Sequence, residues 1–343
     1  MEMRSMSDKS RRSAGIDAVR AFCCYAIVFH HMVFPGVDFG ACRVEEAFVD
    51  VIRYGFWTLP TLFLLSGYLM MHGYSGSVFM KLKRRIKRLV VPFFAYNLVE
   101  LLIRSSNGSI NWGEATLAIL GLRMETPCSQ FWYIRALIVL FALSPVFYYM
   151  TISRQRRIIG FILLSAWAIA STLLGLDKCL HKVLPAYSLI LCFVGAVLAT
   201  CQIDLCKFAS SHRRWLVPLG IVGMLLFGLG MRNGILLALP GFLWIAFSDI
   251  LERLFASKPG RFLIETSFFA YGAHLLFRDA ISWGYASNIG PYLMQRCGSL
   301  SVATIVGFVV CVACMMITYI IMHKASEKII FLRLPFQVIN GTL

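Results

Sequence analysis

Long apolar segments alternate with short, polar and mostly basic connections along the 343 residues of the chain. A segment of about 20 apolar residues, at a rise of ~1.5 Å per residue, is long enough for a helix to cross the hydrocarbon core of a bilayer. The pattern predicts ten such helices, at about 15–35, 55–72, 87–104, 131–150, 157–175, 184–201, 215–231, 233–251, 262–283 and 300–323. We therefore expect an all-α integral membrane bundle, with an N-terminal tail at 1–14, one membrane domain at 15–325 and a C-terminal tail at 326–343.

The composition is that of a polytopic membrane protein, because 59% of the residues are hydrophobic and only 15% are charged. A formal net charge of +16 would also suit a nucleic-acid-binding protein, but the placement of the basic residues indicates membrane topology instead. Of the 33 Lys and Arg residues, 22 lie in the two tails and in alternate connections, and nine lie in the connections of the opposite side. Since cytoplasmic connections carry the basic excess, both termini are predicted to be cytoplasmic.

The first apolar segment, GIDAVRAFCCYAIVFHHMVF, carries ionisable side chains that cost free energy at membrane depth. Arg20 and His31 are eleven positions apart, which places them about 20° apart around a helix and ~16 Å apart along it. Asp17 falls near the same line, whereas His30 points about 100° away. Such a polar stripe usually faces a bundle interior or a wet cavity, so it is a candidate functional site. The structural alternative is an Arg that snorkels to the interface and a His that is hydrogen-bonded in the core.

The spacing of Arg, ten residues and His in IDAVRAFCCYAIVFHH resembles the opening helix of the acyltransferase 3 family of polytopic membrane acyltransferases. Four further stretches resemble motifs of that family in the same order: LFLLSGYLM, the basic turn KLKRRIKRLVVP, QFWYI and SFFAYGAH. The residues that carry the resemblance, which runs from residue 15 to about 280, are Arg20, His31, Ser66, Arg85, Arg88, Trp132, Tyr133, Tyr271 and His274.

The resemblance implies a multi-pass O-acyltransferase of the bacterial cytoplasmic (inner) membrane. It would move an acyl group, commonly acetyl, from coenzyme A to a hydroxyl of a cell-envelope polysaccharide, glycolipid or related acceptor. His31 would be the general base, because an imidazole titrates near neutral pH and can take the proton of an attacking hydroxyl. Arg20, a second catalytic candidate, would bind the donor phosphates with Arg85 and Arg88, since guanidinium forks match phosphate oxygens. Acyl-CoA would be a substrate rather than a bound cofactor, and the expected partners are the lipid bilayer, the donor and the carbohydrate acceptor, with no nucleic acid.

Two more charged residues are site candidates on position alone. Glu100 lies twelve residues beyond Arg88, much as His31 lies eleven beyond Arg20, so the carboxylate and the imidazole are predicted at a similar depth. A carboxylate beside an imidazole fixes its tautomer, which makes Glu100 a catalytic candidate; the alternative is an interfacial Glu without a chemical role. Arg135, near the outer end of the fourth segment, is a candidate for pairing with a carboxylate or contacting the acceptor.

Two of the motifs can also be explained by their position at the membrane, without a role in catalysis or donor binding. Trp132 and Tyr133 also fit an aromatic belt at the membrane interface, and the basic turn at 81–88 also fits anionic headgroups. The pair Ser66–Gly67 permits close approach of two helix backbones.

Other chemistries find little support in the sequence. The chain contains no H-E-x-x-H and no G-x-S-x-G, so neither a metal site nor a serine nucleophile elbow is predicted. Four of the eleven cysteines lie in or beside predicted outer connections, where disulfides are permitted, but four cysteines allow three connectivities and free thiols are an open alternative. These are Cys42, Cys128, Cys179 and Cys297. The oligomeric state is open, a homo-oligomer included.

A proton-coupled secondary transporter is the main alternative, because ten spans with buried charges would suit it. Inverted-repeat transporters show matching broken helices in both halves, whereas here the charged helices cluster in the first four segments. A glycan flippase or assembly scaffold is a further alternative, and it would need neither His31 nor the basic turn.

Overall fold

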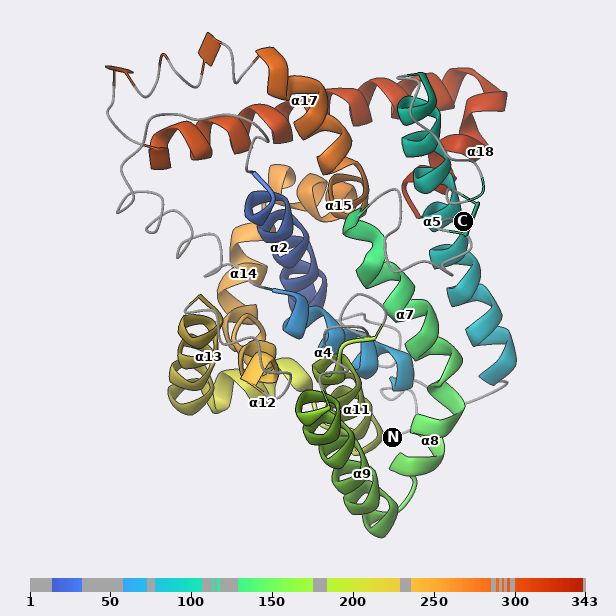
Figure 1. Ribbon diagram of the computed structural model, residues 1–343, viewed down its shortest axis with the longest axis vertical. Helices are drawn as coiled ribbons and strands as arrows, with labels where there is room; N and C mark the ends of the chain where they lie inside the picture. The colour runs from blue at the N-terminus through green and yellow to red at the C-terminus, as the bar shows by residue number, and fades with distance from the viewer. Residues whose placement is uncertain are drawn as a thin grey trace, which may run out of the picture. The chain divides into compact units, whose positions relative to one another are not determined.

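The computed structural model describes residues 14–32, 58–72, 78–106, 129–174, 184–228, 236–284 and 300–341, with a few single residues between these ranges. Every regular element within these ranges is a helix, and no strand occurs in them (Figure 1). The predicted all-α fold is confirmed for the described part of the chain.

Most of the predicted segments coincide with one α-helix or with two consecutive ones. The helices concerned are α2 (Ala14–His30), α4 (Leu59–Met71), α5 (Val78–Ser106), α7 (Trp132–Ala142), α8 (Ser144–Thr151), α9 (Arg154–Leu173), α11 (Ala186–Thr200), α13 (Arg213–Gly228), α15 (Lys258–Gly284) and α17 (Leu300–Lys328).

The segment predicted at 233–251 is the exception. In place of one long helix, its described residues form the 3-10 helices η2 (Leu236–Phe242) and η3 (Ile245–Phe247) and the start of α14 (Ser248–Phe255). Pro240 lies inside η2, and Pro removes a backbone donor and crowds the preceding turn. The prediction of one continuous helix at 233–251 was therefore wrong for its described residues.

Length and composition identify few complete spans among the described helices. One helix, Val302–Lys328, is long and apolar enough to cross a membrane, and up to three spans result if each of two bent pairs counts as one. The pairs are α7 with α8, bent by 55°, and α11 with α12 (Leu205–Ser211), bent by 106°. Two other apolar helices, α4 and α18 (Ile330–Ile339), are shorter. These apolar helices agree with a membrane protein, while the number of ten spans and the cytoplasmic termini stay predictions.

The chain divides into two compact units. The first comprises Met1–Cys23, Thr58–Arg85 and Ala136–Glu265, and the second comprises Cys24–Trp57, Ile86–Arg135 and Thr266–Leu343. Helices α2, α5, α7 and α15 each contribute residues to both units.

Helices α4 and α11 pack against each other at two glycines in the first unit. A Cβ atom on Gly67 would overlap the backbone carbonyl of Cys192, and a Cβ atom on Gly195 would overlap the backbone carbonyl of Leu64. Only glycine lets two helix backbones come this close. The close approach predicted for the Ser66–Gly67 pair is therefore confirmed at Gly67.

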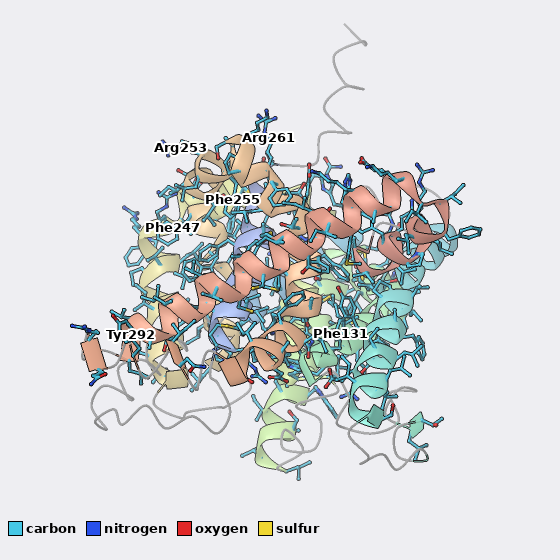
Figure 2. The ribbon with its side chains drawn as sticks, turned by 90° about the horizontal axis from the view of Figure 1, so that it is seen from above. Phe131, Phe247, Arg253, Phe255, Arg261 and Tyr292 are labelled. Carbon is cyan, nitrogen blue, oxygen red and sulfur yellow. The ribbon has the colours of Figure 1, made fainter. Side chains whose placement is uncertain are left out.

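Ion pairs join α13 to α14 in the same unit. Arg213 pairs through Nη2 with Asp249, and its Nε donates to the carbonyl of Ala246 at 2.8 Å. Arg253, one turn along α14, reaches the other carboxylate oxygen of Asp249 at 3.5 Å. Figure 2 shows Arg253 and Arg261 extending away from the ribbon, and both are exposed.

The end of the chain is fastened to the helices of the second unit. Helix α18 turns back beside the end of α17 (Figure 1). Tyr96 on α5 donates from its hydroxyl to the carbonyl of Ile339 at 3.1 Å, and Asn340 Nδ2 donates to the hydroxyl of Tyr319 on α17 at 3.2 Å. The segment predicted as a C-terminal tail, 326–343, therefore contains a packed helix, and the side of the membrane on which it lies stays a prediction.

Candidate active site

The last turns of α2 are held in the second unit by Tyr25. Its hydroxyl lies 2.8 Å from Oγ1 of Thr266 on α15, and it donates to Sδ of Met316 on α17 at 3.8 Å. His31 follows the last residue of α2 directly. Two helices distant in sequence therefore fix the part of α2 from which His31 extends.

His31 meets a second histidine, His274, on α15. Their ring nitrogens, Nδ1 of His31 and Nε2 of His274, are 3.2 Å apart, and the ring centroids are 5.0 Å apart at an interplanar angle of 36°. His274 is fully buried, whereas His31 is half-buried. Of the two residues, His31 is the one with exposed surface.

The backbone partners of the two rings determine which nitrogens carry protons. Nδ1 of His274 lies 2.7 Å from the carbonyl oxygen of Tyr271, and Nδ1 of His31 lies 2.9 Å from the carbonyl oxygen of Ile27. A carbonyl oxygen only accepts, so both Nδ1 atoms donate. In the neutral pair both Nε2 atoms are then unprotonated. Nε2 of His274 accepts from His31, and Nε2 of His31 has a lone pair for a proton.

Polar and aromatic contacts hold Tyr271, three residues before His274 on α15, within the second unit. The hydroxyl of Tyr271 donates to the carbonyl of Gln130 at 2.6 Å, and Nε2 of Gln130 donates to the carbonyl of Gly272 at 3.0 Å. The rings of Phe131 and Tyr133 lie 5.9 Å and 6.0 Å from the ring of Tyr271. These reciprocal bonds attach the short 3-10 helix η1 (Ser129–Phe131), which precedes α7, to the middle of α15. Phe131 is labelled in Figure 2.

Arg278 and Gln130 belong to this region, although the sequence analysis did not select them as site residues. Nη1 of Arg278 donates to the backbone carbonyl of His31 at 3.4 Å, and its Nη2 lies 2.6 Å from Asp279. The sequence could have pointed to Arg278, because a residue four positions after His274 lies on the same helix face as that histidine. Gln130 is the first residue of the QFWYI motif, but nothing in the sequence distinguished it from its neighbours.

Arg20 and Asp17 form an ion pair in the first unit, on the earlier part of α2. Their side chains are 3.5 Å apart and are 40% and 25% exposed. Both charged groups are thus partly accessible, which a donor-binding role requires. Their i, i+3 spacing accounts for the pairing.

The other predicted site residues are distributed over several elements. Ser66 donates from Oγ to the carbonyl of Leu62 within α4 at 2.7 Å. Arg135 is buried, with 6% of its surface exposed, and Trp132 is half-buried. Arg88 is exposed, and Glu100 is half-buried.

The roles predicted for all of these residues stay predictions, and two of them need a remark. The ring contacts described for His31 are with Ile27 and with the histidines, and Glu100 is not among them, so its catalytic role is untested. The side chain of Arg85 lies outside the described residues, although its backbone belongs to α5.

The described ranges contain thiols but no cluster of metal-binding side chains. Within them, no group of three or more His, Cys, Asp and Glu side chains is placed to hold a metal ion. Cys42, Cys128, Cys179 and Cys297 lie outside the described residues. Cys311 and Cys314 are free thiols on α17, and Cys311 is buried beneath His274, to whose carbonyl its Sγ donates at 3.9 Å.

A family model described as an acyltransferase domain matches residues 13–322, which is nearly the whole chain. The chain belongs to the acyltransferase 3 family. It is therefore a membrane acyltransferase, an enzyme that transfers acyl groups other than amino-acyl groups. Comparisons with curated proteins and with solved structures gave no match. The acyltransferase 3 domain includes both histidines of the pair and every predicted site residue.

Proposed function

We propose that this acyltransferase moves an acyl group, commonly acetyl, from acyl-CoA to a hydroxyl of a cell-envelope polysaccharide, glycolipid or related acceptor. The observation that carries the proposal is the state of His31: its Nδ1 is bonded within the protein, and its Nε2 is left to act as a base. Membership of the acyltransferase family supplies the reaction class.

The proposed chemistry needs one base and one electrophile. A hydroxyl is a weak nucleophile near neutral pH, and Nε2 of His31 would take its proton as the oxygen attacks the thioester carbonyl carbon. The new carbon–oxygen bond gives the ester, and the carbon–sulfur bond breaks. The sulfur of coenzyme A then receives the proton that His31 took up, so the reaction balances without a cofactor or an oxidant. A general base of this kind typically contributes 10²–10⁴ in rate.

The basic side chains are the proposed ligands of the donor. Arg88, which is exposed on α5 in the second unit, is proposed to bind a phosphate of acyl-CoA. Arg20 and Arg85 are proposed as further phosphate ligands from their positions in the family motifs. Guanidinium groups suit this role because they stay charged and bind phosphate oxygens in two-point contacts.

The proposed setting is the bacterial inner membrane, with both termini in the cytoplasm. This orientation is supported by the excess of Lys and Arg in one set of connections. The acyl-CoA donor is made in the cytoplasm, so the basic turn at 81–88 would face the compartment that contains it.

Replacing His31 tests the proposal directly. In the purified protein, His31→Ala should lower acyl transfer to the acceptor by 10²-fold or more and leave acyl-CoA binding nearly unchanged, because a base acts on the acceptor's proton. The matched control is His30→Ala, which removes the neighbouring imidazole whose ring stands edge-on to His31 at 5.2 Å. A His31→Ala protein that inserts normally and transfers acyl groups at the wild-type rate would refute the proposed mechanism.

A further inference from the structure

We propose that His274 is a positioning residue for His31: its Nε2 accepts a hydrogen bond from Nδ1 of His31 and so keeps the substrate-facing Nε2 of His31 unprotonated. This inference rests on the proposed function, in which His31 is the base. His274 itself is fully buried and does not touch the acceptor.

The direction of the hydrogen bond follows from the backbone partners. If His274 donated from Nε2, it would need protons on both nitrogens, because its Nδ1 already donates to Tyr271 at 2.7 Å. Nδ1 of His31 would then be unprotonated and would face the carbonyl oxygen of Ile27 at 2.9 Å, which places two lone pairs against each other. Only the arrangement in which His31 donates satisfies every contact of the neutral pair.

One proton on Nδ1 of His31 therefore has two acceptors, the Ile27 carbonyl and His274. The carbonyl lies on the same helix as His31 and can follow it if α2 moves. His274 lies on α15, which is fixed to α2 through Tyr25 and Thr266. The second acceptor thus holds the His31 ring to a neighbouring helix and fixes its plane as well as its tautomer.

The same contact is favourable after proton transfer. When Nε2 of His31 gains the hydroxyl proton, the ring becomes a cation and its Nδ1–H becomes a stronger donor. Nε2 of His274 is then a neutral acceptor beside a charged donor, and such bonds are about twice as strong as neutral ones. The partner therefore stabilises the state that forms during the reaction more than the resting state.

The remaining titratable and charged groups described around the pair come from three helices. On α2, the ring of His30 stands edge-on to His31. On α15, Arg278 binds the His31 carbonyl and pairs with Asp279. On α17, the Cys311 thiol donates to the His274 carbonyl. None of these contacts uses a ring nitrogen of His274 or Nδ1 of His31, so a substitution at His274 changes only the two bonds of its ring, to His31 and to Tyr271.

Two substitutions at His274 separate the two bonds that its ring makes. His274→Gln keeps an acceptor near the position of Nε2, and its carbonyl oxygen can accept from His31. His274→Asn keeps a donor near the position of Nδ1, which can still bind Tyr271, but it is too short to reach His31. Both are polar amides of similar character, so they control for each other in folding and insertion.

The expected results differ between the two variants. A wrong histidine tautomer can cost ~10⁴ in kcat. In His274→Asn the Ile27 carbonyl still favours the tautomer of His31 with its proton on Nδ1, so the expected loss is smaller. We expect kcat to fall about 10- to 100-fold and KM for acyl-CoA to stay unchanged. The acidic limb of its pH–rate profile should move to lower pH, because the cationic His31 has lost an acceptor. His274→Gln should restore at least part of the rate and return the acidic limb toward that of the wild type.

A purely structural role for His274 would lower the amount of folded enzyme without moving the pH profile. Equal rates and profiles for the Asn and Gln variants, at equal folded concentration, would overturn the inference. The result is separable from the proposed function: His31→Ala then still abolishes transfer, whereas failure of the proposed function would leave His31→Ala active.

Discussion

Replacing Gly67 by Ala should destabilise the first unit, because the added methyl group meets backbone rather than a side chain. In the native packing of α4 against α11, a Cβ on Gly67 would overlap the carbonyl oxygen of Cys192, and its carbonyl and α carbons are also within 2.7 Å. A flexible side chain could rotate away, but a helix carbonyl is held by its own hydrogen bond. The two helices must therefore separate locally to make room.

The magnitude follows from two opposing effects. Ala is favoured over Gly inside a helix by about 1 kcal/mol, so α4 by itself gains stability. Overpacking of a filled interior typically costs ~1–3 kcal/mol, and a backbone obstacle places Gly67 at the upper end of that range. The net change is a loss of about 2 kcal/mol in the free energy of unfolding, or roughly 30-fold in the folding equilibrium.

Reversible unfolding in mixed detergent micelles, followed by tryptophan fluorescence, measures this change. Gly15→Ala is the matched control in the same unit, because a Cβ there meets the ends of the Glu252 and Cys206 side chains at 3.2 Å and 3.5 Å. The control should be as stable as the wild type or slightly more stable. If Gly67→Ala were also at least as stable as the wild type, the close approach of α4 and α11 would not be the constraint inferred here.

Three further outcomes are expected. Deleting residues 330–343 removes the carbonyl that Tyr96 binds and the amide that binds Tyr319, so thermal unfolding should show a loss of about 2 kcal/mol at ~1 kcal/mol per bond. The control Phe331→Ala, at a side chain 86% exposed, should change stability by less than ~0.5 kcal/mol. Equal effects of the deletion and the control would contradict the packed role of α18. Asp249→Asn should cost no more than ~1 kcal/mol by the same measurement, because both of its Arg partners are solvent-accessible; a much larger loss would show that the pairs are buried in the membrane. On a cysteine-free background in sealed cells, a membrane-impermeant thiol reagent should label a cysteine placed at residue 107 and not one at residue 155, and the reverse pattern would invert the predicted topology.

Local chemistry made most of the helices predictable. Apolar runs of the right length indicated where helices form, and α2, α9, α15 and α17 occur where the pattern predicts them. The pattern failed at 233–251, because mean apolarity does not report the local effect of Pro240 on a helix. It also did not reveal α18, since a ten-residue amphipathic helix is held by its contacts with other helices rather than by its own propensity.

The sequence by itself determined the family and the all-helical class, and it made His31 a candidate base, because these depend on spacing within single segments. It also contained His274 in a motif, but it did not show that this residue meets His31: the two are separated by 243 positions, and no local rule relates them. Helical depth suggested a carboxylate, Glu100, as a partner, and that stays a prediction; the contact that the tertiary structure describes for the His31 ring is with a second imidazole. Depth along a helix is set by the rise per residue, which sequence gives directly. Rotation about the helix axis, and with it the choice of neighbour, is set by how α2, α15 and α17 pack, and only the folded chain decides that.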